Sequence, residues 1–157
     1  KRFILFGILA AYILNIIIYL DRYHVHFPRN EAQNWGLPYK TLLNRINEEK
    51  YKDKDVIFAR TEFSHYIYLL FYSKYDPDKY QKEVMRYPPT GDKFVHVKSY
   101  DRFEFRDIVW SKDILRENTL LIDFSKDIPP LVKINKLKTT EILLPNEETM
   151  FTIVETK

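Results

Sequence analysis

The chain has 157 residues, of which 45% are hydrophobic and 16% aromatic, and it carries a formal net charge of +3 and no cysteine. Without cysteine, disulfides and thiolate metal sites are excluded. Basic and acidic residues alternate after residue 22 without a block of one sign, which argues against a nucleic-acid partner. The three glycines form neither GxGxxG nor GxxxxGK(S/T), so there is no glycine-rich phosphate loop.

Residues 3–20, FILFGILAAYILNIIIYL, form an uncharged run close to the N-terminus. As a helix this run spans about 27 Å, close to the hydrocarbon thickness of a bilayer. A secretory signal has a shorter apolar region, roughly 7 to 15 residues, and a small-residue cleavage site, whereas this run continues into the bulky DRYHVHFP. We therefore predict a transmembrane helix over residues 1–22. The alternative is a core helix that is buried on every face.

The charges around this helix predict its orientation. Lys1 and Arg2 precede the run, and positive charge in short flanking segments favours the cytoplasmic side. Arg22 and Arg29 follow the run and act in the opposite sense. The predicted location is the cell membrane, with the C-terminal domain extracytoplasmic. Because the chain begins with Lys, we also expect it to be a fragment of a longer protein.

Residues 23–38 are predicted to form an extended juxtamembrane linker, because two prolines and a glycine in this segment disfavour regular secondary structure. A folded domain over residues 39–157 follows. Its first element is a helix, since Tyr39, Leu42, Leu43 and Ile46 recur at helical spacing. The short apolar run 55–59 predicts a strand covered on both faces.

The most distinctive stretch of the domain is residues 61–85, for which we predict a helix, a break and a second helix. Thr61 is the expected cap of the first helix, whose body, 63–72, is apolar or aromatic nearly all round and is therefore predicted to be buried between layers. Asp76 is the expected cap of the second, with Pro77 at its first position and Met85 near its end.

The rest of the chain reads mainly as strands. Residues 93–97, 102–110 and 119–124 are predicted strands, and Phe103 and Phe105 share one face of the second. Residues 111–118 predict a short helix or turn, and the C-terminus predicts two strands about a turn at 145–148. The fold class is therefore α/β: one N-terminal transmembrane helix followed by a compact extracytoplasmic domain with a mixed sheet.

Few residues in the chain suggest chemistry. His24 and His26 would share one side of an extended chain and could ligate a metal, but no third ligand is suggested. The acids Asp76, Asp78 and Glu83 are better explained by helix capping than by catalysis. Aromatic and imidazole side chains near the membrane can contact a glycan or the lipid surface. The candidates for such contacts are Tyr23, His24, His26, Trp35 and Tyr39.

Several segments together resemble the C-terminal portion of bacterial polytopic glycosyltransferases of the GT-C class, which are similar to protein O-mannosyltransferases and aminoarabinose transferases. The segments are YHVHFP, WGLPYK, SHYIYLLFYSKYDPDKYQ, NTLLIDFSKDIPP and FTIVET. The matched positions are Tyr23, Pro28, Trp35, Gly36, Lys40, 66–72, Asp76, Pro77, Tyr80 and Gln81. His65 departs from the pattern, because such relatives often have proline before the YIY.

The resemblance implies a parent enzyme that transfers a sugar from a polyprenyl-phosphate donor to an acceptor. It implies that the catalytic acid lies in the first outer loop of the full protein, so no catalytic, cofactor-binding or metal-binding residue is assigned to this accessory segment. The implied partners are membrane lipid, upstream transmembrane helices and a lipid-linked sugar. The alternative is a self-contained single-span protein whose outer domain binds a partner or a glycan.

Overall fold

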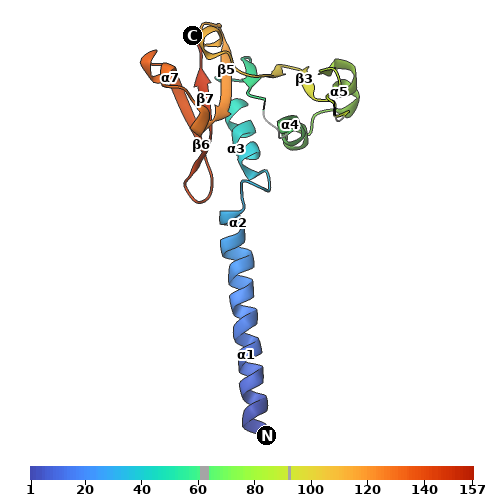
Figure 1. Ribbon diagram of the computed structural model, residues 1–157, viewed down its shortest axis with the longest axis vertical. Coiled ribbons are helices and arrows are strands. Elements are labelled where there is room, and N and C mark those ends of the chain that lie inside the picture. The colour runs from blue at the N-terminus through green and yellow to red at the C-terminus, as the bar shows by residue number, and fades with distance from the viewer. Residues whose placement is uncertain (61–63, 92) are drawn as a thin grey trace.

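The computed structural model describes residues 1–60, 64–91 and 93–157, which form a long N-terminal helix and one mixed α/β domain (Figure 1). The helical elements are α1 (Arg2–Asp21), η1 (Arg22–His26), α2 (Phe27–Asn30), α3 (Leu37–Ile46), α4 (His65–Ser73), α5 (Pro77–Glu83), α6 (Trp110–Asp113), η2 (Ser125–Asp127) and α7 (Pro130–Ile134). The strands are β1 (Asp55–Phe58), β2 (Met85–Arg86), β3 (Val97–Tyr100), β4 (Phe103–Phe105), β5 (Thr119–Phe124), β6 (Lys138–Leu143) and β7 (Thr149–Glu155).

The N-terminal helix is continuous from Arg2 to Asn30 and extends away from the domain (Figure 1). It is long and apolar enough to span a membrane, and none of its apolar window is buried in the chain. The helix runs further than predicted, because residues 23–30 are helical and not extended. Pro28 does not stop it, since Pro28 lies in the first turn of α2, just after the π-helical turn η1, where a wider backbone turn can accommodate the proline ring.

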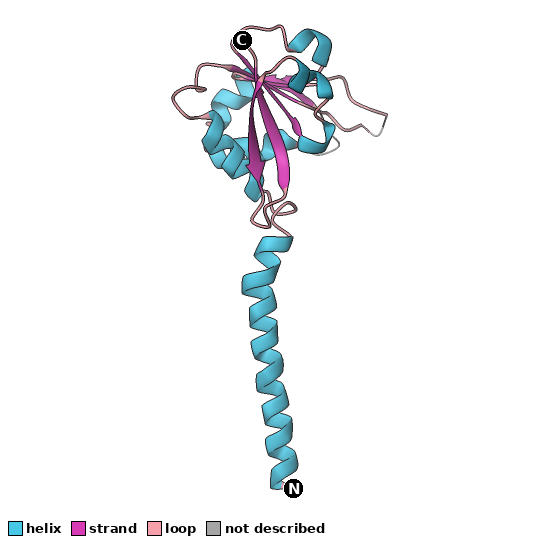
Figure 2. Ribbon diagram, turned by 90° about the vertical axis from the view of Figure 1, so that its left-hand side faces the viewer, coloured by secondary structure: helices cyan, strands magenta, loops and turns pink. Residues whose placement is uncertain are grey.

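The sheet has the strand order β2-β3-β4-β1-β5-β7-β6. Strand β1 pairs in parallel with both β4 and β5, and the outer pairings are antiparallel. The predicted mixed sheet is therefore confirmed. The C-terminal hairpin of β6 and β7 is also as predicted, and its turn points toward the end of the N-terminal helix (Figures 1 and 2).

Helices cover both faces of the sheet (Figure 2). On one face, α3 and α4 pack on the larger core, to which β1 contributes Val56 and Phe58. On the other face, Ile57 of β1 meets Val132 of α7 and the residues around α6. This alternation confirms that β1 is buried on both sides, as the apolar run 55–59 predicts.

Helix α3 connects the membrane-type helix to the domain. Leu42 and Ile46 are fully buried, which confirms the predicted helical spacing. At its C-terminal end, the Arg102 guanidinium donates to the backbone oxygens of Ile46 (2.9 Å) and Tyr51 (2.6 Å). A cation at this end also suits the negative end of the helix dipole.

The prediction of a helix buried between layers at residues 63–72 is wrong for its described part. In α4 only His65 and Leu69 are buried, whereas Phe71 is 73% exposed. The aromatic residues give the segment no polar stripe, so its exposed side could not be recognised from the pattern. The cap predicted at Thr61 lies outside the described residues.

The second predicted helix is confirmed in its start and nearly in its end. The Asp76 side chain accepts hydrogen bonds from the backbone N–H groups of Asp78 (2.8 Å) and Lys79 (3.2 Å), and Pro77 is the first residue of α5. The strand predicted over 93–97 begins only at Val97, and the short β2 and α7 were not anticipated.

The two faces of α4 should respond very differently to the same substitution. Leu69→Asp should unfold the domain, because an unpaired buried carboxylate costs several kcal/mol. Phe71→Asp should change the free energy of unfolding by no more than about 0.5 kcal/mol, since its side chain already faces solvent. Chemical denaturation followed by circular dichroism distinguishes them, and equal destabilisation by both would contradict this orientation of α4.

Candidate functional site

An aromatic column leads from the long helix into the domain. Tyr19 stacks on Tyr23 with ring centroids 5.9 Å apart, and Tyr23 stacks on Phe27 at 6.0 Å. The ring of Phe27 lies 6.1 Å from Trp35, which is 69% exposed. Rings of this kind are favoured where hydrocarbon gives way to water. Tyr23 and Trp35 thus belong to one column, in which each contacts Phe27.

The two histidines beyond the apolar run do not form a shared site. Residues two apart on a helix do not face each other, so the helical backbone removes the geometry that an extended chain would give His24 and His26. His26 Nε2 lies 3.3 Å from an Asp21 carboxylate oxygen. Among the described residues, no group of three or more His, Asp or Glu could hold a metal ion.

Tyr39 occupies a different environment from the one expected. Its side chain is 3% exposed, because α3 turns it into the core. Its ring stacks on Tyr68 at 4.4 Å, and its hydroxyl lies 2.6 Å from Nδ1 of His65. Burial raises the pKa of Tyr39 and lowers that of His65 to about 4. Both groups are therefore neutral near pH 7, and the hydrogen bond between them is a structural one.

The turn before α3 depends on one glycine. Gly36 has a φ of 72°, in the left-handed region, and a Cβ atom placed there would lie 2.5 Å from Cε1 of Tyr68. Only glycine combines this backbone with so close a ring. The close approach of the Gly36 backbone to the Tyr68 ring packs the connection to the long helix against α4.

A groove of about 310 Å³ lies beside this turn, at the end of the domain nearest the helix. We call it the helix-proximal groove; it is lined by Gln33, Asn34, Tyr39, Tyr68, Phe124, Lys126 and Met150. It continues into a shallower hollow, about 220 Å³, which also reaches Leu144, Glu148 and Thr149 in the β6–β7 hairpin. Its volume lies at the lower end of the range for small-molecule sites.

The polar groups of the groove lie at its rim. Lys126 is exposed, and its ammonium nitrogen lies 5.7 Å from the ring centroid of Phe124. The side-chain amide of Asn34 donates to a Glu31 carboxylate oxygen at 2.7 Å, which leaves the amide oxygen of Asn34 available. Gln33 is exposed beside it. The groove therefore offers an apolar, aromatic interior with one cation and two amides at the opening.

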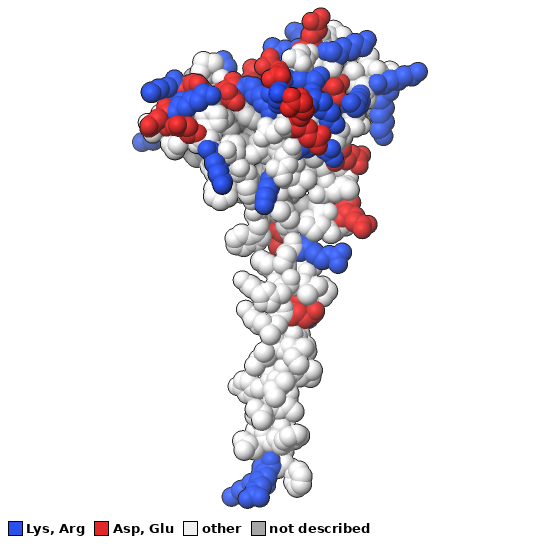
Figure 3. Space-filling view, turned by 180° about the vertical axis from the view of Figure 1, so that it is seen from behind, with Lys and Arg blue, Asp and Glu red and all other residues white. Residues whose placement is uncertain are grey.

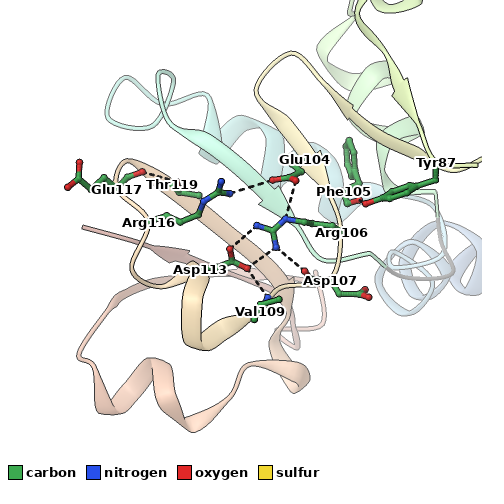
Figure 4. A network of polar contacts seen from close by, with 10 residues as sticks. All are labelled: Tyr87, Glu104, Phe105, Arg106, Asp107, Val109, Asp113, Arg116, Glu117 and Thr119. Atoms are coloured by element: carbon green, nitrogen blue, oxygen red, sulfur yellow. Dashed lines mark hydrogen bonds and ion pairs between the residues drawn. The ribbon is translucent and has the colours of Figure 1, made fainter.

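Carboxylates elsewhere in the domain have structural roles. Asp76 caps α5, and Glu83 accepts a hydrogen bond from the Tyr75 hydroxyl at 2.7 Å. Asp113 receives both terminal nitrogens of Arg106, at 2.7 and 2.8 Å, and the backbone N–H of Val109 (Figure 4). The Arg106 pairing holds the pKa of Asp113 below its usual value. This network ties α6 to β4 and leaves Asp113 no proton to exchange near neutral pH.

Asp123 is the one carboxyl group in the described chain whose pKa rises to about 6. Desolvation is the main cause, since its side chain is largely buried; a hydrogen bond from the backbone N–H of Phe124 acts in the opposite sense, and the charge of Asp127 raises the value further. Asp123 faces away from the helix-proximal groove, because Phe124, the next residue along the strand, lines it. It is therefore not part of that site.

Comparisons of the chain with family models, with curated proteins and with solved structures gave no match.

Sequence reasoning missed most of the groove. Phe124, Lys126 and Met150 were not identified from the sequence as site residues. They meet because β5 pairs with β7, so that the last residue of β5 and the first residues of β7 lie near residues 33 and 34. The alternation in 119–124 does place Phe124 on the same face as Leu120 and Ile122. That pattern predicts a core position for Phe124, and nothing in it signals a groove.

His65 and Asp123 should give the domain two opposing responses to acid. The pKa of His65 in the folded chain, about 4, is below the ordinary 6.5, so the unfolded state binds more protons between these values and stability falls as pH falls. Asp123 behaves oppositely between pH 3.8 and 6, where the folded state binds more protons. Each slope is about 1.4 kcal/mol per pH unit, so the wild-type chain should show little change over this window.

Asp123→Asn should therefore expose an acid-side loss of stability that the wild-type chain lacks. His65→Phe should instead gain stability on acidification relative to wild type. Thermal unfolding measured from pH 4 to 7 tests both, and parallel pH profiles for all three chains would contradict the assigned pKa shifts.

Trp35 should report on the membrane surface. The chain has two tryptophans, so Trp110→Phe leaves Trp35 as the single emitter and Trp35→Phe leaves Trp110. In nanodiscs that contain brominated phosphatidylcholine, fluorescence of Trp35 should be quenched more strongly, because its ring continues the column from Phe27. Equal quenching of the two residues would show that Trp35 is not at the interface.

Proposed function

We propose that this chain is the last membrane helix and the extracytoplasmic domain of an integral-membrane glycosyltransferase that takes a sugar from a polyprenyl-phosphate donor. The resemblance of its motifs to GT-C enzymes suggests the activity. The observation that carries the proposal is the aromatic column from Tyr19 to Trp35, because it joins an apolar helix directly to the domain. A domain attached in this way stays at the membrane surface, where a lipid-linked sugar would present its headgroup.

In this proposal the domain is accessory. It covers the outer mouth of the membrane cavity or contacts the acceptor, and the catalytic acid belongs to the first outer loop of the parent protein. The distribution of charge supports a domain that lies against other parts of the enzyme. In the view of Figure 3, Lys, Arg, Asp and Glu gather on the half of the domain away from the helix, and the half next to it is largely uncharged.

A membrane-anchored binding domain with a single span is the second candidate. The helix-proximal groove favours it, since a small-molecule site in the domain would not need further membrane helices. The two candidates differ in the gene. The transferase requires further apolar segments upstream and an Asp or Glu in the first outer loop, whereas the single-span protein requires a reading frame that encodes no other apolar segment long enough to span a membrane.

The activity is tested with membranes that contain the full-length protein. We expect them to transfer a radiolabelled sugar from a polyprenyl-phosphate donor, and replacement of the acid in the first outer loop by its amide should abolish transfer. An inactive full-length protein with all donors offered would count against the transferase and in favour of the binding domain. Transfer that survives replacement of the acid would instead contradict its assignment as the catalytic residue.

The orientation can be measured because the chain has no cysteine of its own. Lys82→Cys, at an exposed position of α5, should react with a membrane-impermeant maleimide in intact spheroplasts. Lys1→Cys, on the other side of the helix, should react only after permeabilisation, because flanking positive charge stays in the cytoplasm. The reverse pattern would place the domain in the cytoplasm and exclude the proposed role.

A further inference from the structure

We infer that the helix-proximal groove binds an organic phosphate whose carbon skeleton is a hydroxylated ring, such as a hexose phosphate. The inference deepens the proposed function and rests on it for the side of the membrane that the groove faces. The aromatic interior and the polar rim of the groove indicate the chemistry of the ligand.

The interior of the groove suits a carbon skeleton. Tyr68 and Phe124 are half-buried, so each presents part of its ring to the groove, and Tyr39 closes the inner end. Aromatic faces pack well against C–H groups. Met150 adds an adaptable apolar contact on the strand side. A puckered sugar ring, which presents C–H groups on its faces, suits these walls better than a compact ion does.

The rim suits hydroxyl groups and one anion. The exposed amides of Gln33 and Asn34 supply donors and acceptors for hydroxyl groups. The Lys126 ammonium is the one cationic group among the lining residues, and a phosphate is a strong acceptor for it. Glu148 lies in the adjoining hollow and would repel an anion there. Lys126 borders both the groove and the hollow, whereas Glu148 borders only the hollow, so we place the phosphate on the groove side of Lys126.

The position of the groove limits the source of the ligand. It opens between residues 33 and 34, just beyond the helix end at Asn30, and the strands whose hairpin turn points back to that end (Figure 1). A phosphate ester held in the outer leaflet could reach it, and so could a soluble one. Both sources present the same sugar phosphate group, and titrations with a soluble ester and with a lipid-linked ester distinguish them.

The two methionines of the chain provide a probe with an internal control. Met150 lines the groove, whereas Met85 is exposed on β2, at the opposite end of the strand order from the β6–β7 hairpin. The full 157-residue chain, labelled with [methyl-13C]methionine, is placed in nanodiscs of phosphatidylcholine and titrated with glucose 1-phosphate. We expect a saturable shift of the Met150 methyl signal and no shift of Met85.

The same titration is made with glucose and with inorganic phosphate, and both should bind more weakly than glucose 1-phosphate. Lys126→Glu should weaken binding by about tenfold or more, equivalent to about 1.4 kcal/mol. Lys133→Glu makes the same charge change at an exposed position of α7, on the other face of the sheet, and should leave the affinity unchanged. A second nanodisc, containing a prenyl-linked glucosyl phosphate, tests delivery from the membrane.

Binding of either phosphate ester supports the inference, and the arm that saturates identifies the source. The inference is overturned if neither ester moves Met150, if inorganic phosphate binds as tightly as glucose 1-phosphate, or if Lys126→Glu and Lys133→Glu have equal effects. The experiment does not involve sugar transfer. Failure of the groove to bind is therefore distinguishable from failure of the transferase assay.

Discussion

The stacking of Tyr39 on Tyr68, with the Tyr39 hydroxyl 2.6 Å from His65, fixes the junction between helix and domain. These contacts join α3, which follows the long helix, to α4, and the edge of the Phe151 ring, 5.1 Å from Tyr39, extends them to β7. Burial makes the hydrogen bond valuable, because either polar group left unpaired would cost about 1–3 kcal/mol. The groove and the turn at Gly36 both depend on this small cluster, because Tyr39 and Tyr68 line the groove and the Tyr68 ring lies against Gly36.

Much of the fold could be predicted because its elements carry strong periodic signals. The α3 spacing, the buried runs of β1 and β5 and the cap at Asp76 each specify a local structure that tertiary packing preserves. The failures occur where the local signal is ambiguous. Proline predicts a break at residue 28, yet proline is acceptable in a first helical turn. The aromatic residues of α4 conceal which side is exposed, because a tyrosine can lie in either environment.

The candidate site was less predictable than the fold. Tyr23 and Trp35 were predicted as interface contacts because amphipathic rings beside an apolar run suit a membrane surface, and the structure places both in one aromatic column. The groove joins residues near positions 33, 68, 124 and 150, and only the strand order brings these together. His65 shows the limit most clearly: in the sequence it appears only as a departure from the family pattern, and its structural role comes from a tyrosine 26 positions earlier.

The unbroken helix from Arg2 to Asn30 has a mechanical consequence. Only residues 31–36 separate it from α3, and Trp35 and Gly36 within them are held by contacts to Phe27 and Tyr68. A connection this short restricts the orientation of the domain relative to the helix more than a long flexible linker would. In a bilayer that this helix spanned, a change of thickness would change the tilt of the helix, and the height and heading of the domain relative to the lipid would change with it.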